Sequence, residues 1–487
     1  MRTLVVNLLR LGGMQAVIAG TAIVRNKVLA LRLGEHGFGE FSQLALLALS
    51  IGVVVAFGFG MSLNRNVAAE PTAAGRQRLL AQANAVLLAL AGVIALVVVP
   101  LLVWRGDLLG AAGLEASPAV LTAAFVLLAF VPLDAAVQHR VAFLTGALDI
   151  RGMTAGRSKA LAAGTVVGVP IVWWFGLPGA ALQLLLITAL IVGFLDRRLR
   201  QTGFRPWAVT FDGPTFRLLV GLGAASLVAG FVQQWSDVVV RSALIRTVDA
   251  AQNGLYQAAL STTYQVKAIV LGSVGSYSIA ELSRDASRER VDVISKDLLQ
   301  VVLPIAGIAL AVLGMLSGPA LLVLYAPSFL PAQSVFPYLL TADFLHVAIW
   351  VVGAPLLATH RTARWLTYEL VFAGTRAATG LLLVPTYGMV GVAVGYLAAT
   401  GLHLVVNVVT FTRLLGYRLP LQGVVLFLSG AALVGASAVL GSLAGSDLRV
   451  YVLGMGLVGA FAAVSLHVVV GIPQAYRWLR DRRGGRR

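Results

Sequence analysis

The chain has 487 residues, of which 59% are hydrophobic and 12% are charged, and its formal net charge is +17. Because a soluble domain carries about 25% charged residues, this composition excludes a soluble globular protein and predicts a polytopic membrane protein. The sequence contains no cysteine, which excludes disulfides and thiolate-bound metals.

Apolar stretches long enough to cross a bilayer follow one another along the chain. They predict transmembrane helices near residues 8–31, 40–61, 79–103, 118–138, 160–175, 179–195, 218–245, 254–280, 298–325, 333–358, 365–384, 389–412, 421–441 and 450–471. The predicted fold is therefore an all-α polytopic membrane protein with about 14 transmembrane helices.

Lysine and arginine residues are distributed unequally between the two sides of these stretches. If the N-terminus is cytoplasmic, 28 of the 37 basic residues lie in cytoplasmic segments, and four lie in outside loops. This bias is typical of membrane proteins and predicts that both termini are cytoplasmic. The basic segments then face anionic lipid headgroups, so the net charge requires no nucleic-acid partner.

Two sequence motifs recur at a nearly constant spacing. FGLPGAAL at 175–182 corresponds to YGMVGVAV at 387–394, and LRLGEHGFGEFSQ at 31–43 corresponds to IRTVDAAQNGLYQ at 245–257. The order and spacing of these motifs indicate an internal duplication. Their glycines are expected to allow close helix packing, with no direct contact to a substrate.

The duplication predicts an N-terminal six-helix half at 1–205 and a C-terminal six-helix half at 206–417. Residues 418–487 are predicted to add two helices and a basic cytoplasmic tail. Because each half contains an even number of helices, both enter the membrane from the same side and form parallel repeats.

Motifs for enzymatic chemistry are missing from the sequence. None of the four lysines follows a glycine, so there is no P-loop for ATP, and the six histidines are dispersed. No Gly-x-Ser-x-Gly motif is present either. We predict a membrane transporter that is not an enzyme and that uses no cofactor or metal site.

Polar side chains inside the predicted helices are candidates for a transport pathway, because charge near the bilayer centre is costly. Lys267, Asp343 and Arg376 lie near the middle of their stretches. The predicted residues of a central substrate-binding cavity are Arg25, Lys27, Gln233, Asp237, Arg241, Lys267, Asp343 and Arg376.

Local ion pairs are the alternative role for several of these residues. Asp237 and Arg241 are four residues apart and are predicted to pair within one helix. Glu369 and Arg376 share a helix face, and each is expected to contact another helix. For Arg25 and Lys267, a substrate contact and a structural ion pair both remain open.

Several segments resemble the bacterial polysaccharide repeat-unit flippases, which include the O-antigen translocases. GTAIVRNKVLALRLGEHGFGEFSQL at 20–44 is similar to the opening of these proteins. The aspartate-containing seventh helix followed by Gly-Leu-Tyr-Gln-Ala, and Tyr-Gly-x-x-Gly near 387–391, are similar to the same family. The repeat-unit flippase family belongs to the multidrug/oligosaccharidyl-lipid/polysaccharide exporter superfamily. Lipid II flippases and multidrug and toxic compound extrusion transporters belong to the same superfamily.

The resemblance implies alternating access in the bacterial inner membrane. The implied substrate is an undecaprenyl-pyrophosphate-linked oligosaccharide that moves from the inner to the outer leaflet. Implied partners are this lipid and the membrane lipids, with a polysaccharide polymerase and glycosyltransferases as further candidates. Arg25 matches a first-helix arginine that faces the central cavity of lipid II flippases. Those proteins also carry an arginine in the second helix, and 40–61 contains none.

Other functions remain open on the sequence alone. A cation-coupled drug antiporter of the same superfamily would suit the mixed charges inside the predicted helices. A lipid II flippase would suit Arg25 and the helix count. A membrane-bound polysaccharide polymerase or ligase would need a sizeable extracytoplasmic loop, which the spacing of the stretches does not provide.

Overall fold

The structure, a computed structural model, describes the backbone of residues 2–284, 288–358, 362–416, 419, 421–445 and 447–484. Side chains are described for 20–268, 271, 298–353, 363–416, 419, 421–445, 447–465 and 467. The charged segment 281–297 and the basic tail 477–487 lie outside the described side chains.

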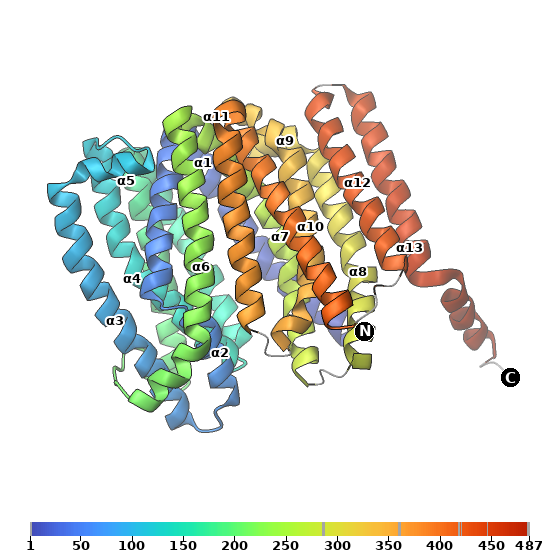
Figure 1. Ribbon diagram of the computed structural model, residues 1–487, viewed down its shortest axis with the longest axis horizontal. Helices are drawn as coiled ribbons and strands as arrows, with labels where there is room; N and C mark the ends of the chain where they lie inside the picture. Colours follow the sequence, from blue (N-terminus) through green and yellow to red (C-terminus); the bar gives the residue numbers. More distant parts are fainter. Residues whose placement is uncertain are drawn as a thin grey trace. The chain divides into compact units, whose positions relative to one another are not determined.

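Every regular element of the described backbone is a helix (Figure 1). In chain order they are α1 (Arg2–Val55), α2 (Phe59–Ala69), α3 (Ala73–Trp104), the 3-10 helix η1 (Gly106–Ala112), α4 (Pro118–Gly146), α5 (Ile150–Gln201), α6 (Gly213–Thr247), α7 (Ala250–Arg284), α8 (Arg288–Met315), α9 (Ser317–Leu324), the 3-10 helix η2 (Pro327–Val335), α10 (Phe336–Ala358), α11 (Thr362–Val409), the π-helix η3 (Thr410–Leu414), α12 (Leu421–Ala444) and α13 (Leu448–Gly484).

Within the described residues, ten helices are long and apolar enough to cross a membrane. Three of them, α1, α5 and α11, each contain two predicted membrane helices joined across a kink. The all-α polytopic fold predicted from the sequence is thereby confirmed, and the chain is a multi-pass membrane protein.

The kinks in α5 and α11 lie at equivalent positions of the repeated glycine motif. Gly176 has φ 58° and ψ −127°, and Gly388 has φ 54° and ψ −132°. Only glycine adopts such backbone angles at little cost. The two occurrences of the motif therefore make the same bend in α5 and in α11.

Replacing Gly176 with alanine tests whether the kink depends on glycine. No atom lies within 4 Å of the added methyl group, so the cost comes from the backbone angle alone. We expect the Gly176→Ala variant to lose about 1–3 kcal/mol of unfolding free energy. Gly193→Ala is the control, since Gly193 lies in the same helix with equally open surroundings and no positive φ. Denaturant unfolding of the purified protein should show no loss for this control.

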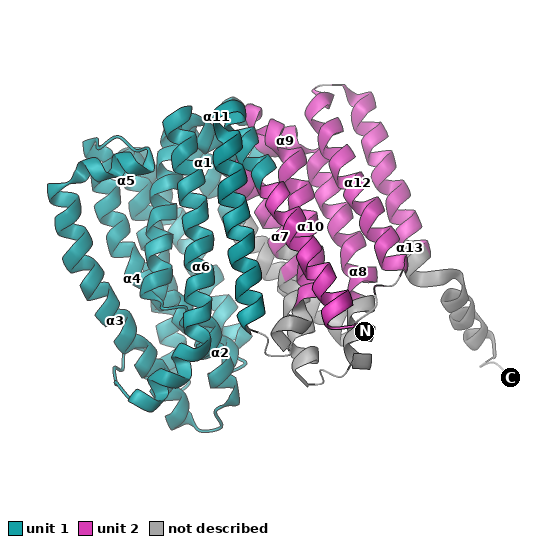
Figure 2. Cartoon of the chain, in the orientation of Figure 1, with its two compact units in different colours: residues 1–257, 323–329, 362–395 teal, residues 258–322, 330–361, 396–487 magenta. Residues whose placement is uncertain are grey.

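The described chain divides into two compact units (Figure 2). Unit 1 comprises 1–257, 323–329 and 362–395, and unit 2 comprises 258–322, 330–361 and 396–487. The division of the sequence into repeats at 205 and 417 stays a prediction.

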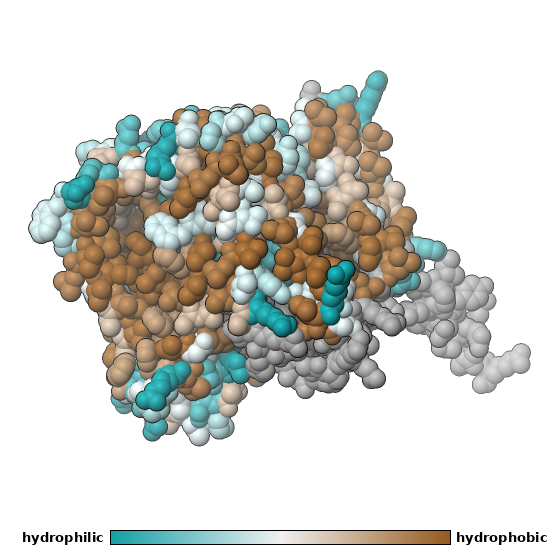
Figure 3. All heavy atoms as spheres, viewed as in Figure 1, coloured by the Kyte–Doolittle hydropathy of each residue, from teal (hydrophilic) through white to brown (hydrophobic). Residues whose placement is uncertain are grey.

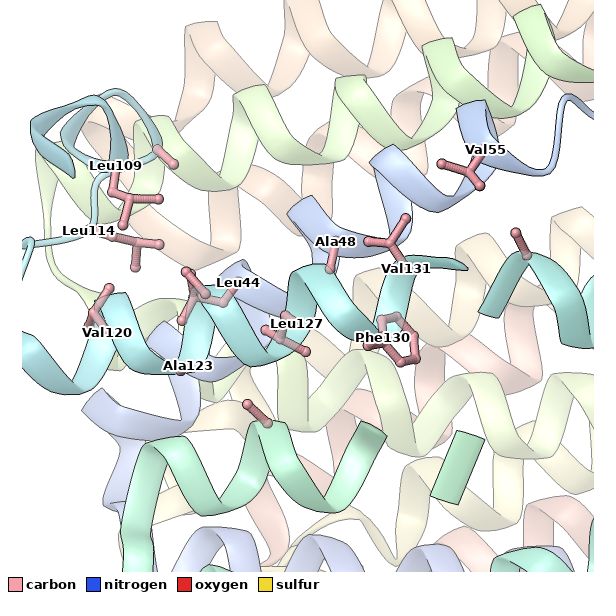
Figure 4. Packing of buried hydrophobic residues seen from close by; sticks show 14 of the residues in the cluster. Leu44, Ala48, Val55, Leu109, Leu114, Val120, Ala123, Leu127, Phe130 and Val131 are labelled. Carbon is pink, nitrogen blue, oxygen red and sulfur yellow. The ribbon is translucent and has the colours of Figure 1, made fainter. Parts of the chain in front are cut away.

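In unit 1, an apolar core fills the space between α1 and α4. Leu44 and Ala48 of α1 lie beside Leu127 and Val131 of α4, and all four are buried (Figure 4). Figure 3 shows apolar side chains over much of the visible face of this unit, where α3 buries little of its own surface. This surface suits contact with lipid chains.

Helix α1 and the start of α7 cross within unit 1 at a pair of glycines. A methyl group on Gly39 would lie 1.8 Å from the carbonyl oxygen of Ala250. A methyl group on Gly254 would lie 2.0 Å from the carbonyl oxygen of Glu35. The two glycines are 215 residues apart, and each added methyl group would meet the backbone of the helix that carries the other glycine, so the two helices cross reciprocally at these glycines.

This crossing should not tolerate even one added carbon. We expect the Gly39→Ala variant to lose about 1–3 kcal/mol of unfolding free energy, because the overpacked helices must move apart. The matched control is Gly20→Ala, also on α1, where the added methyl group meets no atom within 4 Å. Equal stability of the two variants in thermal unfolding would contradict the close crossing.

Candidate functional site

A polar stripe joins α6 to the first part of α11 within unit 1. Gln233 and Asp237 lie one turn apart on α6, and Glu369 and Arg376 lie on the facing side of α11. The Gln233 amide donates a hydrogen bond to Glu369, and Arg376 Nη1 donates to Asp237 Oδ2 at 3.0 Å. Glu369 and Arg376 therefore contact another helix, as predicted from their spacing.

Arg241 continues this stripe but uses different partners. Arg241 is 3% exposed, and its guanidinium donates to Asn253 Oδ1 at 2.7 Å and to Gln257 Oε1 at 2.8 Å on α7. A further hydrogen bond of 2.7 Å reaches Ser42 Oγ on α1. The amides and the hydroxyl hold Arg241 where α1, α6 and α7 meet.

The predicted ion pair within one helix, between Asp237 and Arg241, is wrong. Asp237 pairs with Arg376 of α11, while Arg241 turns to the amides of α7. The packing of α11 against α6 brings a second guanidinium to the carboxylate, and this tertiary contact replaces the local one.

A second cluster of polar residues in unit 1 lies around Asn26 and Lys27 of α1. Asn26 Nδ2 donates to the hydroxyl of Tyr325 at 3.1 Å, and the Lys27 ammonium donates to the backbone carbonyl of Tyr325. The Tyr325 ring stacks on Phe329, with ring centroids 5.3 Å apart. Arg25 is partly buried on the same helix. Among the described residues, no carboxylate forms an ion pair with it.

Unit 2 contains the third polar group. Lys267 Nζ of α7 lies 2.6 Å from Asp343 Oδ1 of α10. The hydroxyl of Tyr396 on α11 donates to the same carboxylate oxygen at 3.0 Å, and the ring of Tyr264 lies 5.5 Å from the ammonium. Asp343 is fully buried and Lys267 is 9% exposed. The two residues predicted separately thus form one buried ion pair.

Sequence reasoning missed the tyrosines of these groups. Site residues were predicted mainly from the cost of burying a charged side chain. Tyr325 and Tyr396 carry no charge, so this criterion did not select them. Glu369 was recognised as an acid inside a predicted helix but was not included in the site. Its contact with Gln233 places it in the α6–α11 stripe.

A buried arginine of unit 1 was also missed. Arg140 of α4 is fully buried and lies 3.0 Å from Asp196 Oδ1 of α5. Its guanidinium also stacks 4.2 Å from the Trp207 ring, and Trp207 Nε1 donates to Asp196 Oδ2 at 2.6 Å. This cluster anchors the segment between α5 and α6, and it accounts for the burial of both charges.

Comparisons with known proteins identify the fold. No protein-family model and no curated protein matches the sequence. A structure of the lipid II flippase MurJ in an inward closed conformation matches with a TM-score of 0.71 at 13% identity, covering 94% of this chain and 98% of that one. An inward-facing multidrug resistance MATE transporter of the MOP superfamily matches with a TM-score of 0.62 at 14% identity, covering 86% and 94%.

A third solved structure is a MOP superfamily transporter from Pyrococcus furiosus. It matches with a TM-score of 0.59 at 16% identity, covering 88% of this chain and 96% of that one. That transporter is described as having a binding pocket of reverse polarity. The chain accordingly has the fold shared by the MurJ flippase and the MATE transporters.

Proposed function

We propose that the protein is a flippase that moves an undecaprenyl-pyrophosphate-linked oligosaccharide from the inner to the outer leaflet of the bacterial inner membrane. The fold it shares with a lipid II flippase and with MATE transporters supports transport by alternating access. Within that fold, Arg25 favours an anionic lipid substrate, because no carboxylate among the described side chains pairs with it.

Arg25 differs from the other cations at membrane depth. Lys267 and Arg376 each pair with an aspartate in the described part of the chain. Arg241 is satisfied by amides and a hydroxyl. Arg25 has no carboxylate partner among the described side chains, although a charge at this depth is costly without one.

A diphosphate would supply the missing anion. Guanidinium groups bind phosphate oxygens with paired, charge-assisted hydrogen bonds, which are stronger than neutral ones. Lys27 lies two residues further along α1, and its ammonium would add a second positive charge. Gln233 and Glu369 in the α6–α11 stripe offer the amide and carboxylate groups that sugar hydroxyls require.

The leaflet distribution of the lipid-linked oligosaccharide tests this proposal directly. Cells depleted of the protein should accumulate the intermediate on the cytoplasmic leaflet, and re-expression should clear it. A normal distribution in depleted cells that contain no redundant flippase would contradict the proposed substrate.

Lipid II is the second candidate substrate, favoured by the likeness to MurJ over 94% of the chain. The same depletion separates the two candidates, since lipid II would then accumulate on the inner leaflet in place of the oligosaccharide. If depletion changes the leaflet distribution of neither lipid but raises the accumulation of drugs in the cell, cation-coupled drug export becomes the better account.

A further inference from the structure

Unit 1 contains an apolar cavity of about 460 Å³ bordered by α1, α3, η1, α4 and α6. Its lining is almost entirely aliphatic, apart from Trp235, Ser242 and Arg246 of α6. Leu44 and Ala48 of α1, Leu109 of η1 and Leu127 of α4 form part of its wall (Figure 4). None of the cations considered for the substrate pathway lines this cavity.

The cavity is as deep as one bilayer leaflet. On α6 it extends from Trp235 to Arg246, which corresponds to about 16 Å at 1.5 Å per residue. Half the hydrocarbon core of a bilayer measures about 15 Å. The cavity lies at the end of unit 1 where α3 ends, α4 begins and α6 ends. It therefore runs from near mid-membrane to one interface.

A positive charge marks the interfacial end. Arg246 is exposed, and its Nε lies 3.4 Å from the carbonyl oxygen of Ser242. The Asp107 carboxylate of η1, which borders the same cavity, pairs with Arg105 at 3.0 Å. Among the described residues, no acidic side chain forms an ion pair with Arg246. An anion at this interface would thus find its counter-charge at the mouth of the cavity.

We infer that this cavity, here called the leaflet groove, binds one acyl chain of an anionic phospholipid whose phosphate contacts Arg246. The apolar wall suits a hydrocarbon chain, the depth suits one leaflet, and the arginine suits the headgroup. The volume is within the range of ligand pockets that hold small molecules. An undecaprenyl chain is far larger than this space, which favours the phospholipid as the occupant.

Lipid binding to the purified full-length protein provides the test. Native mass spectrometry with added palmitoyl-oleoyl phosphatidylglycerol should detect one tightly retained lipid. Val239 lines the groove and is 41% exposed, so a Val239→Trp substitution should block the groove without disturbing the core. We expect this variant to weaken lipid binding about tenfold.

Val228→Trp is the matched control. Val228 is 42% exposed on the same helix, about three turns earlier, and does not line the groove. This variant should bind the lipid as the parent protein does. Arg246→Gln should weaken binding about tenfold, and Arg246→Lys should retain most of it.

Two results would overturn the inference. The first is unchanged phosphatidylglycerol binding in both the Val239→Trp and the Arg246→Gln variants. The second is displacement of phosphatidylglycerol by equimolar undecaprenyl phosphate, which would assign the groove to a prenyl chain. Neither result depends on whether the protein transports an oligosaccharide.

Discussion

Replacing Arg25 with alanine should slow transport roughly tenfold to hundredfold while leaving the protein inserted in the membrane. In the proposed flippase, Arg25 supplies the counter-charge for a diphosphate, and its loss removes at least one charge-assisted contact. Such contacts contribute about 1.5–3 kcal/mol, which corresponds to roughly a tenfold to hundredfold loss of transport. The measurement is the clearance of lipid-linked oligosaccharide from the inner leaflet after re-expression of the variant.

Two further variants make the Arg25 result specific. Arg25→Lys should keep part of the activity, because an ammonium still attracts phosphate but cannot form the paired contact. Arg32→Ala should keep full activity, since Arg32 is an exposed arginine of the same helix whose Nε donates to the carbonyl of Trp173 at 2.7 Å. Normal transport by Arg25→Ala at normal protein abundance would remove Arg25 from the proposed site.

Hydrophobicity predicted the membrane helices well, but it did not predict where they end. The stretch beginning at residue 160 belongs to α5, which starts at Ile150. Asp149 caps that helix by accepting a hydrogen bond of 3.1 Å from the Gly152 amide. A helix continues as far as its caps and packing allow, whereas an apolar stretch marks only the part that lies in lipid.

The pairing of charges could not be read from sequence spacing. Asp237 and Arg376 are 139 positions apart, and only the packing of α6 against α11 brings them together. The same holds for Lys267 and Asp343, which come from α7 and α10. A single sequence shows which charges are costly to bury, but their partners depend on tertiary contacts. The recurrence of the motif around Gly176 and Gly388 could be seen in the sequence, which suggested close helix packing there, but the kink that each glycine makes comes from the structure.

Breaking the buried Lys267–Asp343 pair should destabilise unit 2 strongly. Lys267→Met leaves a buried carboxylate, and Asp343→Asn leaves a buried ammonium without its counter-charge. Each single variant should lose about 3–5 kcal/mol of unfolding free energy. Denaturant unfolding of the purified variants measures this loss.

The double variant Lys267→Met/Asp343→Asn distinguishes a structural pair from a transport residue. A neutral pair removes both buried charges and still allows Tyr396 to donate to the amide oxygen, so stability should largely return. A neutral pair can serve folding equally well, so the proposed transport assigns these two charges a role beyond folding. We therefore expect the double variant to fold but to transport at least about tenfold more slowly.

A second neutralised pair serves as the control for that experiment. Arg198→Met/Asp149→Asn removes a partly exposed ion pair, and the asparagine can still cap α5. This variant should change stability by less than about 1 kcal/mol and should transport normally. If the Lys267→Met/Asp343→Asn variant also transports normally, the buried pair holds α7 to α10 and has no part in transport. If it folds and fails to transport while the control succeeds, the charges themselves are needed to move the substrate.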